Sequence, residues 1–341
     1  LNVSSALFIL FVMHLNNRNL PKKILTWYDN NKRTLPWRIR QNSKKKQYYR
    51  ILSEFMLQQT QVKTVIPYFN NFVKKIPNFK ALSTCNEKTI LKLWEGLGYY
   101  RRAKNLHKTA KILVKKYKSN IPKEFEEIIK LPGVGEYTAS ALLALIYNKP
   151  FIPMDGNVKR VFYRLFGGEK KIDNYSFQTN RNADLAEALM EFGAIICKPL
   201  NPLCEVCNLK KNCKYFKNEF FISKNKKRFV KEKKYNIYCY LKRQTKQIAL
   251  TKNKSLSFLS NFNIPATQIE KKKINKNKKK WIYLCNYKNN ISNIKMSINL
   301  FYKFTKDKPQ NFKWYYIDRP ENEFIPSFTK KIFKKITKVY V

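Results

Sequence analysis

Four cysteines, Cys197, Cys204, Cys207 and Cys213, crowd into one short stretch of the chain. Four thiolates this close in sequence can bind either a tetrahedral zinc ion or an iron–sulfur cluster. A zinc ribbon usually contains two C-x2-C pairs, whereas this stretch contains one. The spacing therefore favours a [4Fe-4S] cluster in a loop at 197–213, which would fold a basic, lysine-flanked lobe without needing to do redox chemistry.

A turn with two glycines, LPGVG at 131–135, lies between two stretches of helical composition. Glycine frees such a turn from Cβ clashes, so the backbone amides of Gly133, Val134 and Gly135 and the start of the next helix can face one anion closely. A DNA phosphate fits this socket. A helix C-cap followed by an ordinary turn is the alternative interpretation of the same glycines.

A candidate acid, Glu54, lies in a segment from Tyr49 to Ile66 whose apolar spacing predicts one amphipathic helix. Gln58 and Gln61 follow Glu54 at the fourth and seventh positions, so the pattern predicts a carboxylate and two amides along one side of that helix. An exposed, solvated surface acid is the alternative for Glu54.

The charge balance points to a polyanionic partner. Lys and Arg total 70 against 22 Asp and Glu, which gives 341 residues a formal net charge of +48. Nucleic acid is the first candidate, although Lys, Asn and Ile are abundant throughout, as an AT-biased genome would produce. A content of 44% hydrophobic and 15% aromatic residues excludes a wholly disordered chain.

The number of cysteines and the N-terminal stretch indicate the cellular compartment in which the protein works. The odd total of seven cysteines, four of them clustered, argues for a reducing cytoplasm and against a disulfide framework. The apolar run within Leu1–Leu15 is too short to span a membrane and has no basic residue before it, so we expect no membrane partner. We interpret residues 1–12 as an upstream extension that precedes the true start.

The chain changes character after the cysteines. Up to Cys213 it reads as helices and tight turns, with predicted helices at Thr89–Trp94, Val158–Phe166 and Asn182–Phe192 among others. Afterwards, β-type runs predominate, and a last helix is predicted at Ser327–Lys338. The fold class is therefore α+β multidomain. The β-type runs are Tyr235–Leu241, Gln247–Leu250, Trp281–Tyr287 and Ile298–Phe304. The expected domains are an extension at 1–20, a helical domain at 21–220, a basic linker at 221–233 and a small α/β domain at 234–341. The last domain contains a low-complexity basic loop at Lys271–Lys280.

Five ordered motifs between Leu25 and Cys213 resemble the helix-hairpin-helix DNA glycosylases, and most closely those of the MutY type, which remove adenine. The resemblance implies an all-helical, two-lobed module that binds double-stranded DNA as a monomer, bends it, and flips out an adenine mispaired with 8-oxoguanine or guanine. The motifs are SEFMLQQTQV, GLGYYRRAKNLH, LPGVGEYTA, MDGNVKR and the four-cysteine loop.

The resemblance also implies roles at the reacting centre. Glu54 would be the general acid that protonates adenine at N7, and its apolar neighbours would raise its pKa. Asp155, just before a helix start, would remain ionised and stabilise the sugar cation. Tyr137 and Asn157 would orient Asp155 and the attacking water, and Glu187 would contact the flipped base.

The remaining implied contacts concern DNA and the kind of glycosylase. Gln58 and Tyr99 would wedge into the duplex, and the hairpin amides would hold a phosphate. Endonuclease III-type relatives carry a lysine nucleophile where this chain has Tyr137, and a phenol cannot form an imine, so a monofunctional enzyme is expected. A bifunctional glycosylase/lyase and an inactive iron–sulfur DNA-binding protein are the alternatives; the retention of Glu54 and Asp155 argues against the second.

The last third resembles the family only faintly, where a NUDIX-like domain recognises 8-oxoguanine. It lacks the glutamate box of NUDIX pyrophosphatases, so nucleotide hydrolysis is not expected. The segment at 294–298 is in register with the family's recognition loop, and Ser297 is its remaining polar contact. A generic basic DNA clamp is the alternative for this domain.

Overall fold

The chain forms two compact units in the computed structural model, and each is described by itself. The helical unit comprises residues 1–87 and 101–224, and the sheet unit comprises residues 88–100 and 225–341. The predicted extension at 1–12, most of the basic linker and the loop at Lys271–Lys280 lie outside the described residues. The described residues are 19–39, 43–168, 179–217, 231–254, 256, 259–260, 262–269, 281–291, 294–319 and 324–340.

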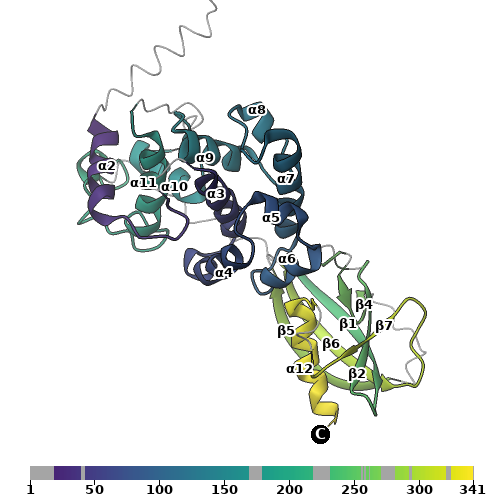
Figure 1. Ribbon diagram of the computed structural model, residues 1–341. Coiled ribbons are helices and arrows are strands. Elements are labelled where there is room, and N and C mark those ends of the chain that lie inside the picture. The colour runs from purple at the N-terminus through teal and green to yellow at the C-terminus, as the bar shows by residue number, and fades with distance from the viewer. Residues whose placement is uncertain are drawn as a thin grey trace, which may run out of the picture. The chain divides into compact units, whose positions relative to one another are not determined.

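The helical unit contains no strand among its described residues, as the sequence predicted (Figure 1). The predicted helices at Val158–Phe166 and Asn182–Phe192 are confirmed. The elements of this unit are α2 (Asn19–Asn31), α3 (Lys44–Leu57), α4 (Val62–Lys75), α5 (Phe79–Thr84), α7 (Arg101–Tyr117), α8 (Phe125–Ile128), α9 (Glu136–Tyr147), α10 (Gly156–Phe166), α11 (Asn182–Ile195) and the 3-10 turn η2 (Lys210–Asn212).

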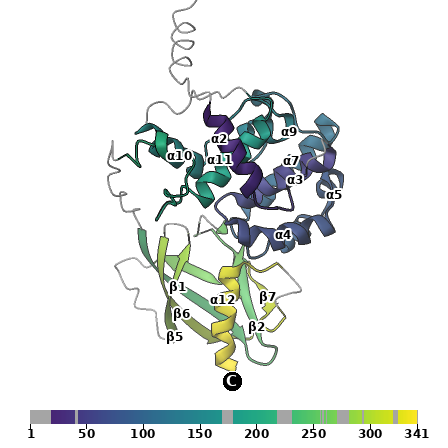
Figure 2. The same cartoon turned by 90° about the vertical axis from the view of Figure 1, so that its left-hand side faces the viewer.

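One hydrophobic cluster joins α2, α10 and α11, which lie together in both views (Figures 1 and 2). Its buried side chains include Tyr28 from α2, Phe162 from α10 and Phe192 from α11. Cys197, Cys207 and Cys213 pack against the same cluster. The cysteine loop is therefore built onto the core that also fixes the N-terminal end of α10.

The prediction of one helix from Tyr49 to Ile66 is wrong, because α3 ends at Leu57 and α4 begins at Val62. Gln58 is the C-cap of α3, Gln61 is the N-cap of α4, and Gln59 between them has a φ of 57°. The carboxylate of Glu54 and the two predicted amides therefore do not line one side of a helix.

The break in the helix comes from a contact that is remote in sequence. Arg102 of α7 donates from Nη1 to the carbonyl oxygens of Phe55 at 3.1 Å and Met56 at 2.8 Å, and also to that of Gln58. The last carbonyls of a helix have no partner within the helix. A buried guanidinium satisfies them here, so the chain can turn after Leu57 without leaving polar atoms unpaired.

The sheet unit is a mixed seven-stranded sheet in the order β3-β2-β1-β6-β5, with β4 paired to β1 and β7 paired to β2. The long strands β1 and β6 are parallel, and the other pairs are antiparallel. The four predicted β-type runs are confirmed. The elements are α6 (Glu87–Leu93), β1 (Lys231–Lys242), β2 (Gln247–Lys252), β3 (Asn263–Ile264), β4 (Ala266–Ile269), β5 (Ile282–Ile291), β6 (Ile294–Phe304), β7 (Lys313–Tyr316), α12 (Ser327–Ile336) and η5 (Thr337–Tyr340).

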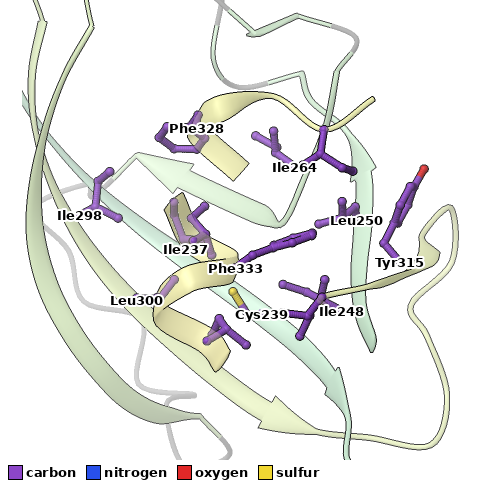
Figure 3. Packing of buried hydrophobic residues seen from close by; sticks show 14 of the residues in the cluster. Ile237, Cys239, Ile248, Leu250, Ile264, Ile298, Leu300, Tyr315, Phe328 and Phe333 are labelled. Carbon is purple, nitrogen blue, oxygen red and sulfur yellow. The ribbon is translucent and has the colours of Figure 1, made fainter. Parts of the chain in front are cut away.

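Helix α12 covers one face of this sheet, which confirms the predicted last helix. Alternate residues of β1, such as Ile237 and Cys239, point to the same side as Leu300 of β6 and pack with Phe333 of α12 (Figure 3). Side chains of a strand alternate between faces. Every second residue of β1 and β6 therefore points to the opposite face of the sheet.

The segment at 88–100 groups with the sheet unit, which its composition did not indicate. The Tyr100 ring centre lies 5.2 Å from that of Phe262 and 4.9 Å from that of Phe324, and Glu95 pairs with Lys330 of α12 at 2.5 Å. These contacts attach the GLGYY turn to the sheet unit.

Candidate active site

Glu54 lies in the last turns of α3 with only 5% of its surface exposed, so the alternative of a solvated surface acid is excluded. Burial is the largest influence on this carboxyl and raises its pKa to about 7. The positive charge of Arg50 and a hydrogen bond from Tyr137 act in the opposite direction. Glu54 is therefore poised to exchange a proton near neutral pH.

Tyr137 lies in the first turn of α9, directly after the glycine turn. Its hydroxyl hydrogen-bonds to Glu54 and also lies 3.5 Å from the Sδ atom of Met190. Burial, followed by the negative charges of Glu54 and Asp155, raises the pKa of the phenol well above its usual value. Tyr137 thus remains a neutral hydroxyl between the two carboxylates.

Asp155 is the N-cap of α10. Its Oδ1 accepts from the backbone amides of Asn157 at 2.8 Å and Val158 at 2.7 Å, and its Oδ2 accepts from the Asn157 side chain at 2.9 Å. Burial raises the pKa of Asp155 from its usual range, while these hydrogen bonds and Arg160 oppose that rise. The carboxylate is held in one orientation by donors that favour its charged form.

Asn157 lies where α10 and α11 approach most closely. A Cβ at Gly193 of α11 would come within 2.6 Å of the Asn157 Cβ, so only glycine fits there. Arg160 donates to the Asn157 side chain at 2.8 Å, to the Gly193 carbonyl at 2.6 Å and to the Cys197 carbonyl at 2.7 Å. The support of Asp155 thus continues through Arg160 into the cysteine loop.

Glu187 of α11 is buried among cations. Its carboxylate pairs with Arg38 at 2.9 Å and with Arg50, and it accepts from the Tyr28 hydroxyl. The neighbouring Glu191 pairs with two arginines in the same way. Each carboxylate of this acidic pair therefore lies against two arginines, and neither is an isolated buried charge.

A cavity of about 630 Å³ opens beside Glu187. Glu54 does not line it, but Arg50 and Glu187 do, and both act electrostatically on Glu54. The volume is within the roughly 300–1,000 Å³ range of small-molecule sites. The lining includes six basic side chains, Lys32, Arg33, Arg38, Lys46, Arg50 and Arg181.

The glycine turn packs directly against α3. Gly133 has a φ of 81°, and a Cβ there would come within 2.9 Å of the Phe55 ring, so this position requires glycine. The Gln58 side chain donates to the Gly133 carbonyl at 3.3 Å. Gly135 is the N-cap of α9 and offers no capping side chain, so the first amides of α9 keep their capacity for an anion.

The four predicted cysteines line one pocket, together with Arg164 and Tyr215 among others. Arg164 donates to the Cys197 Sγ atom at 3.4 Å and to the loop carbonyl of Lys198 at 2.6 Å. Among the described residues, no group of three or more His, Cys, Asp or Glu side chains is spaced to hold a metal ion. The four thiols thus share one cavity.

Two predicted DNA contacts belong to the sheet unit. Tyr99 is 41% exposed and has a φ of 47°. Ser297 lies within strand β6, between β1 and β5, and accepts a hydrogen bond from Asn286 at 3.1 Å. The segment at 294–298, which is in register with the family's recognition loop, is therefore a strand in this chain, paired on both sides.

The sequence patterns missed the arginines that organise the site. Arg50 and Arg160 lie on the polar faces of predicted helices, where a basic residue usually signifies solvent exposure. The available signal was their spacing: Arg50 precedes Glu54 by one helical turn, and Arg160 follows Gly156 by one turn.

A helix-hairpin-helix turn beside one buried and one half-buried carboxylate, in an all-helical unit, defines a DNA glycosylase of the helix-hairpin-helix class. Residues 52–183 match the HhH-GPD superfamily base excision DNA repair protein family. A thermostable thymine-DNA glycosylase has a similar structure, with a TM-score of 0.51 and 28% identity, covering 59% of this chain and 97% of its own.

Relatives of nearly full length refine this class. The chain is 38% identical to the adenine DNA glycosylase of Buchnera aphidicola subsp. Baizongia pistaciae, over 92% of this chain and 96% of the relative. It is 35% identical to the adenine DNA glycosylase of the subspecies Schizaphis graminum, over 91% and 96%. The chain belongs to the adenine DNA glycosylase family. None of its described helices combines the length and hydropathy needed to cross a membrane.

Proposed function

We propose that the protein is a monofunctional DNA glycosylase of base excision repair that hydrolyses the N-glycosidic bond of adenine mispaired with 8-oxoguanine or guanine. The observation that carries this proposal is that Glu54 and Asp155 both act electrostatically on Tyr137, while the two carboxyl groups have different surroundings. Glycoside hydrolysis requires one carboxylic acid and one carboxylate.

In the first step, Glu54 donates its proton to N7 of the flipped adenine. A carboxyl group with a pKa of about 7 is substantially protonated at neutral pH and can still release its proton to a leaving group. Protonation lets adenine depart as a neutral base while the sugar acquires positive charge. The hydrogen bond from Tyr137 fixes the direction of the Glu54 side chain.

Asp155 then stabilises the sugar cation until water attacks. Its three hydrogen-bond donors at the N-terminal end of α10 hold the carboxylate in place before the charge develops, which is the arrangement that favours electrostatic catalysis. Asn157 and Tyr137 orient Asp155 and the water. The products are free adenine and an abasic site.

The cavity beside Glu187 supports a role in holding the base. Adenine presents an amino group as a donor. The Glu187 carboxylate is fixed by Arg38 and Arg50, so it offers a preoriented acceptor to that amino group. Flipping is required because the glycosidic bond of a stacked base is inaccessible.

The duplex is held at several points. The amides of Gly133, Val134 and Gly135 bind a phosphate at the start of α9, while Gln58 and Tyr99 wedge into the base stack. Gln58 is anchored to the Gly133 carbonyl, which supports a rigid link between phosphate binding and the wedge.

A single-turnover assay tests the proposal. Duplexes that carry adenine opposite 8-oxoguanine, guanine, cytosine or thymine are incubated with the protein and then treated with alkali. We expect strand cleavage at adenine only after alkali, and only opposite 8-oxoguanine or guanine. Absence of cleavage in every duplex would favour the inactive DNA-binding protein.

The bifunctional lyase is the second candidate, and Tyr137 argues against it. The phenol occupies the position of the lysine nucleophile and cannot form an imine. Borohydride should therefore trap no adduct that depends on residue 137, and strands should remain intact before alkali. A trapped adduct on an oxidised-pyrimidine duplex would establish the lyase.

We propose that Cys197, Cys204, Cys207 and Cys213 hold a [4Fe-4S] cluster. The donor set fits, because four thiols surround one cavity and Arg164 supplies positive charge beside them. The bound cluster would cross-link the loop and contribute to folding and DNA affinity. Cys204→Ser should lose visible charge-transfer absorbance, and with it stability, while a control at a half-buried thiol outside the loop, Cys85→Ser, should lose neither.

We propose that the sheet unit, divergent and NUDIX-like, selects the base opposite adenine, with Ser297 as a contact to 8-oxoguanine. Its mixed sheet with a helix on one face supports this assignment. Ser297→Ala should lower the preference for 8-oxoguanine over guanine, whereas a generic basic clamp would lose affinity for both duplexes equally.

A further inference from the structure

The sheet unit has a face that α12 does not cover, called the outer face here. It is formed by the residues of β1, β6 and β5 that alternate with the core positions. The register places Tyr238 beside Phe301 and Tyr240 beside Lys303, and Phe301 in turn beside Tyr283. The core positions Ile237, Cys239 and Leu300 point to α12 instead (Figure 3).

Aromatic rings form a continuous group on the outer face. Tyr238 stacks on Phe301 with ring centres 5.3 Å apart and an interplanar angle of 18°, and it lies 4.9 Å from the Trp281 ring. Tyr240 is also 4.9 Å from Trp281, and Tyr283 is 5.6 Å from Phe301. These rings span three adjacent strands without a hydrophobic layer above them from α12.

The rings reach solvent to different extents. Tyr283 is 55% exposed, and Tyr238, Tyr240, Trp281 and Phe301 are half-buried. Soluble proteins seldom leave contiguous aromatic surface in water unless it binds something. The neighbouring positions are polar: Asn236, Asn299 and Asn286 form a hydrogen-bonded row across the three strands. The outer face is therefore an aromatic platform bordered by amides.

Positive charge lies among the rings. Lys303 Nζ is 4.8 Å from the Tyr240 ring centre and 4.9 Å from that of Trp281, and Lys242 Nζ is 5.3 Å from that of Trp314. The seven strands together carry nine lysines and one acidic residue, Glu232. The ligand of this face must present flat rings and negative charge together.

We propose that the outer face binds single-stranded DNA, with unpaired bases stacking on Tyr283 and its neighbouring rings and phosphates paired with Lys303 and Lys242. Every base has a π-face, and stacking on aromatic side chains beside basic residues is the usual chemistry of single-strand recognition. In a duplex the base faces are hidden by stacking, so this platform suits unpaired strands. The site is additional to adenine excision, and it lies on the same face of the sheet as Ser297, which alternates with the core residues Met296 and Ile298.

The charge distribution excludes a second copy of the chain as the favoured occupant. A two-fold dimer would place the same surface patch of each copy against the other. On this face that would bring lysines against lysines, with one acidic residue per copy on the strands to offset them. A polyanion has no such repulsion.

The test measures the binding of the full-length protein to labelled oligothymidylate and to an abasic strand of the same length, about 12 nucleotides, at constant ionic strength. The abasic strand keeps the phosphates and lacks the rings, so the ratio of the two affinities isolates stacking from the charge of the whole chain. Oligothymidylate should bind more tightly and quench tryptophan fluorescence, because Trp281 and Trp314 are half-exposed while the remaining tryptophans are buried.

Tyr283→Ala should weaken oligothymidylate binding about tenfold and leave the abasic strand almost unaffected. Lys303→Glu should weaken both strands. Lys334→Glu makes the same charge change on an exposed position of α12, on the opposite side of the sheet, and should alter affinity about twofold or less. Adenine release from a duplex should be unchanged in all three variants, which shows that they are folded.

Three results would overturn the proposal. The first is an unchanged preference for oligothymidylate over the abasic strand in Tyr283→Ala. The second is tighter binding of oligouridylate than of oligothymidylate, which would assign the platform to RNA. The third is a wild-type dimer in sedimentation that Tyr283→Ala converts to a monomer, which would make the outer face a contact between copies.

Discussion

Glu54 and Asp155 are both carboxylic acids at the reacting centre, yet they are held by opposite means. Glu54 lies within α3, where the backbone amides are already used by the helix, and is buried among Arg50 and Tyr137. Asp155 lies one residue before α10, where the amides of Asn157 and Val158 are free to donate to it. The position of each acid relative to its helix therefore decides which protonation state the fold supports.

This difference shows how one reaction obtains an acid and an anion from the same functional group. A carboxyl inside a helix gains no backbone donors, so desolvation prevails and the proton is retained. A carboxyl at an N-cap gains donors and the favourable end of the helix dipole, so the charge is supported despite partial burial. The predictions below test whether the two environments act in this way.

Glu54→Gln should have the largest effect, because the variant keeps the shape of the side chain and removes the proton donor. We expect single-turnover excision to fall by about 10²–10⁴-fold with DNA binding retained. The exposed Glu136→Gln on α9 is the matched control and should excise normally. Near-normal excision by Glu54→Gln would contradict the role of Glu54.

Asp155→Asn should reduce excision by about 10²–10³-fold, since asparagine can still cap α10 but carries no charge. Asp155→Ala should lose the same activity and, in addition, about 1 kcal/mol of stability through loss of the cap. Thermal unfolding and single-turnover rates of the two variants separate the charge from the cap. Equal stability of the two variants would show that the cap contributes nothing.

The pH profile should distinguish the two carboxyls in one experiment. Because Glu54 must be protonated, excision should fall about tenfold per pH unit above its pKa of about 7, and it should fall on the acid side as Asp155 is neutralised. The folded state binds the Glu54 proton more tightly than the unfolded state, so stability should also decrease as pH rises from about 4.5 to about 7. The fall in excision above pH 7 and the loss of stability between about pH 4.5 and 7 should both be absent from Glu54→Gln.

Tyr137→Phe should have the smallest effect, about tenfold or less on the rate, because it removes one hydrogen bond to Glu54. That hydrogen bond lowers the pKa of Glu54, so its removal should move the alkaline limb of the profile to higher pH. Tyr117→Phe removes a comparable bond to Glu127 on the surface and should leave the profile unchanged. If the alkaline limb of Tyr137→Phe stays at the wild-type pH, the Tyr137 hydroxyl does not influence the pKa of Glu54.

Much of the scaffold could be predicted from the sequence, since most of its helices and long strands follow from local patterns. The end of α3 could not, because glutamines are good helix formers and no glycine or proline marks the break at Gln58–Gln61. Arg102, more than forty residues away, satisfies the carbonyls at this end. A helix boundary set by a distant partner leaves no local signal.

The same limit applies to the sheet unit. The alternating runs predicted its strands, but the register with a family recognition loop did not indicate that the segment at 294–298 pairs with β1 and β5. Strand order depends on pairings between segments that are remote in the chain. For the same reason, the group of rings around Tyr238 and Trp281 emerged only from the register.

The sequence by itself determined the chemistry that is available: two carboxylates, a tyrosine in place of a lysine, a glycine turn and four clustered cysteines. Residue types and spacing suffice for these because each is a local property of the chain. Only the tertiary structure decided the state of each group. Burial raises the pKa of Glu54, the end of α10 supports the charge of Asp155, and Arg38 and Arg50 form ion pairs with Glu187, because desolvation and charge pairing depend on what packs around a side chain.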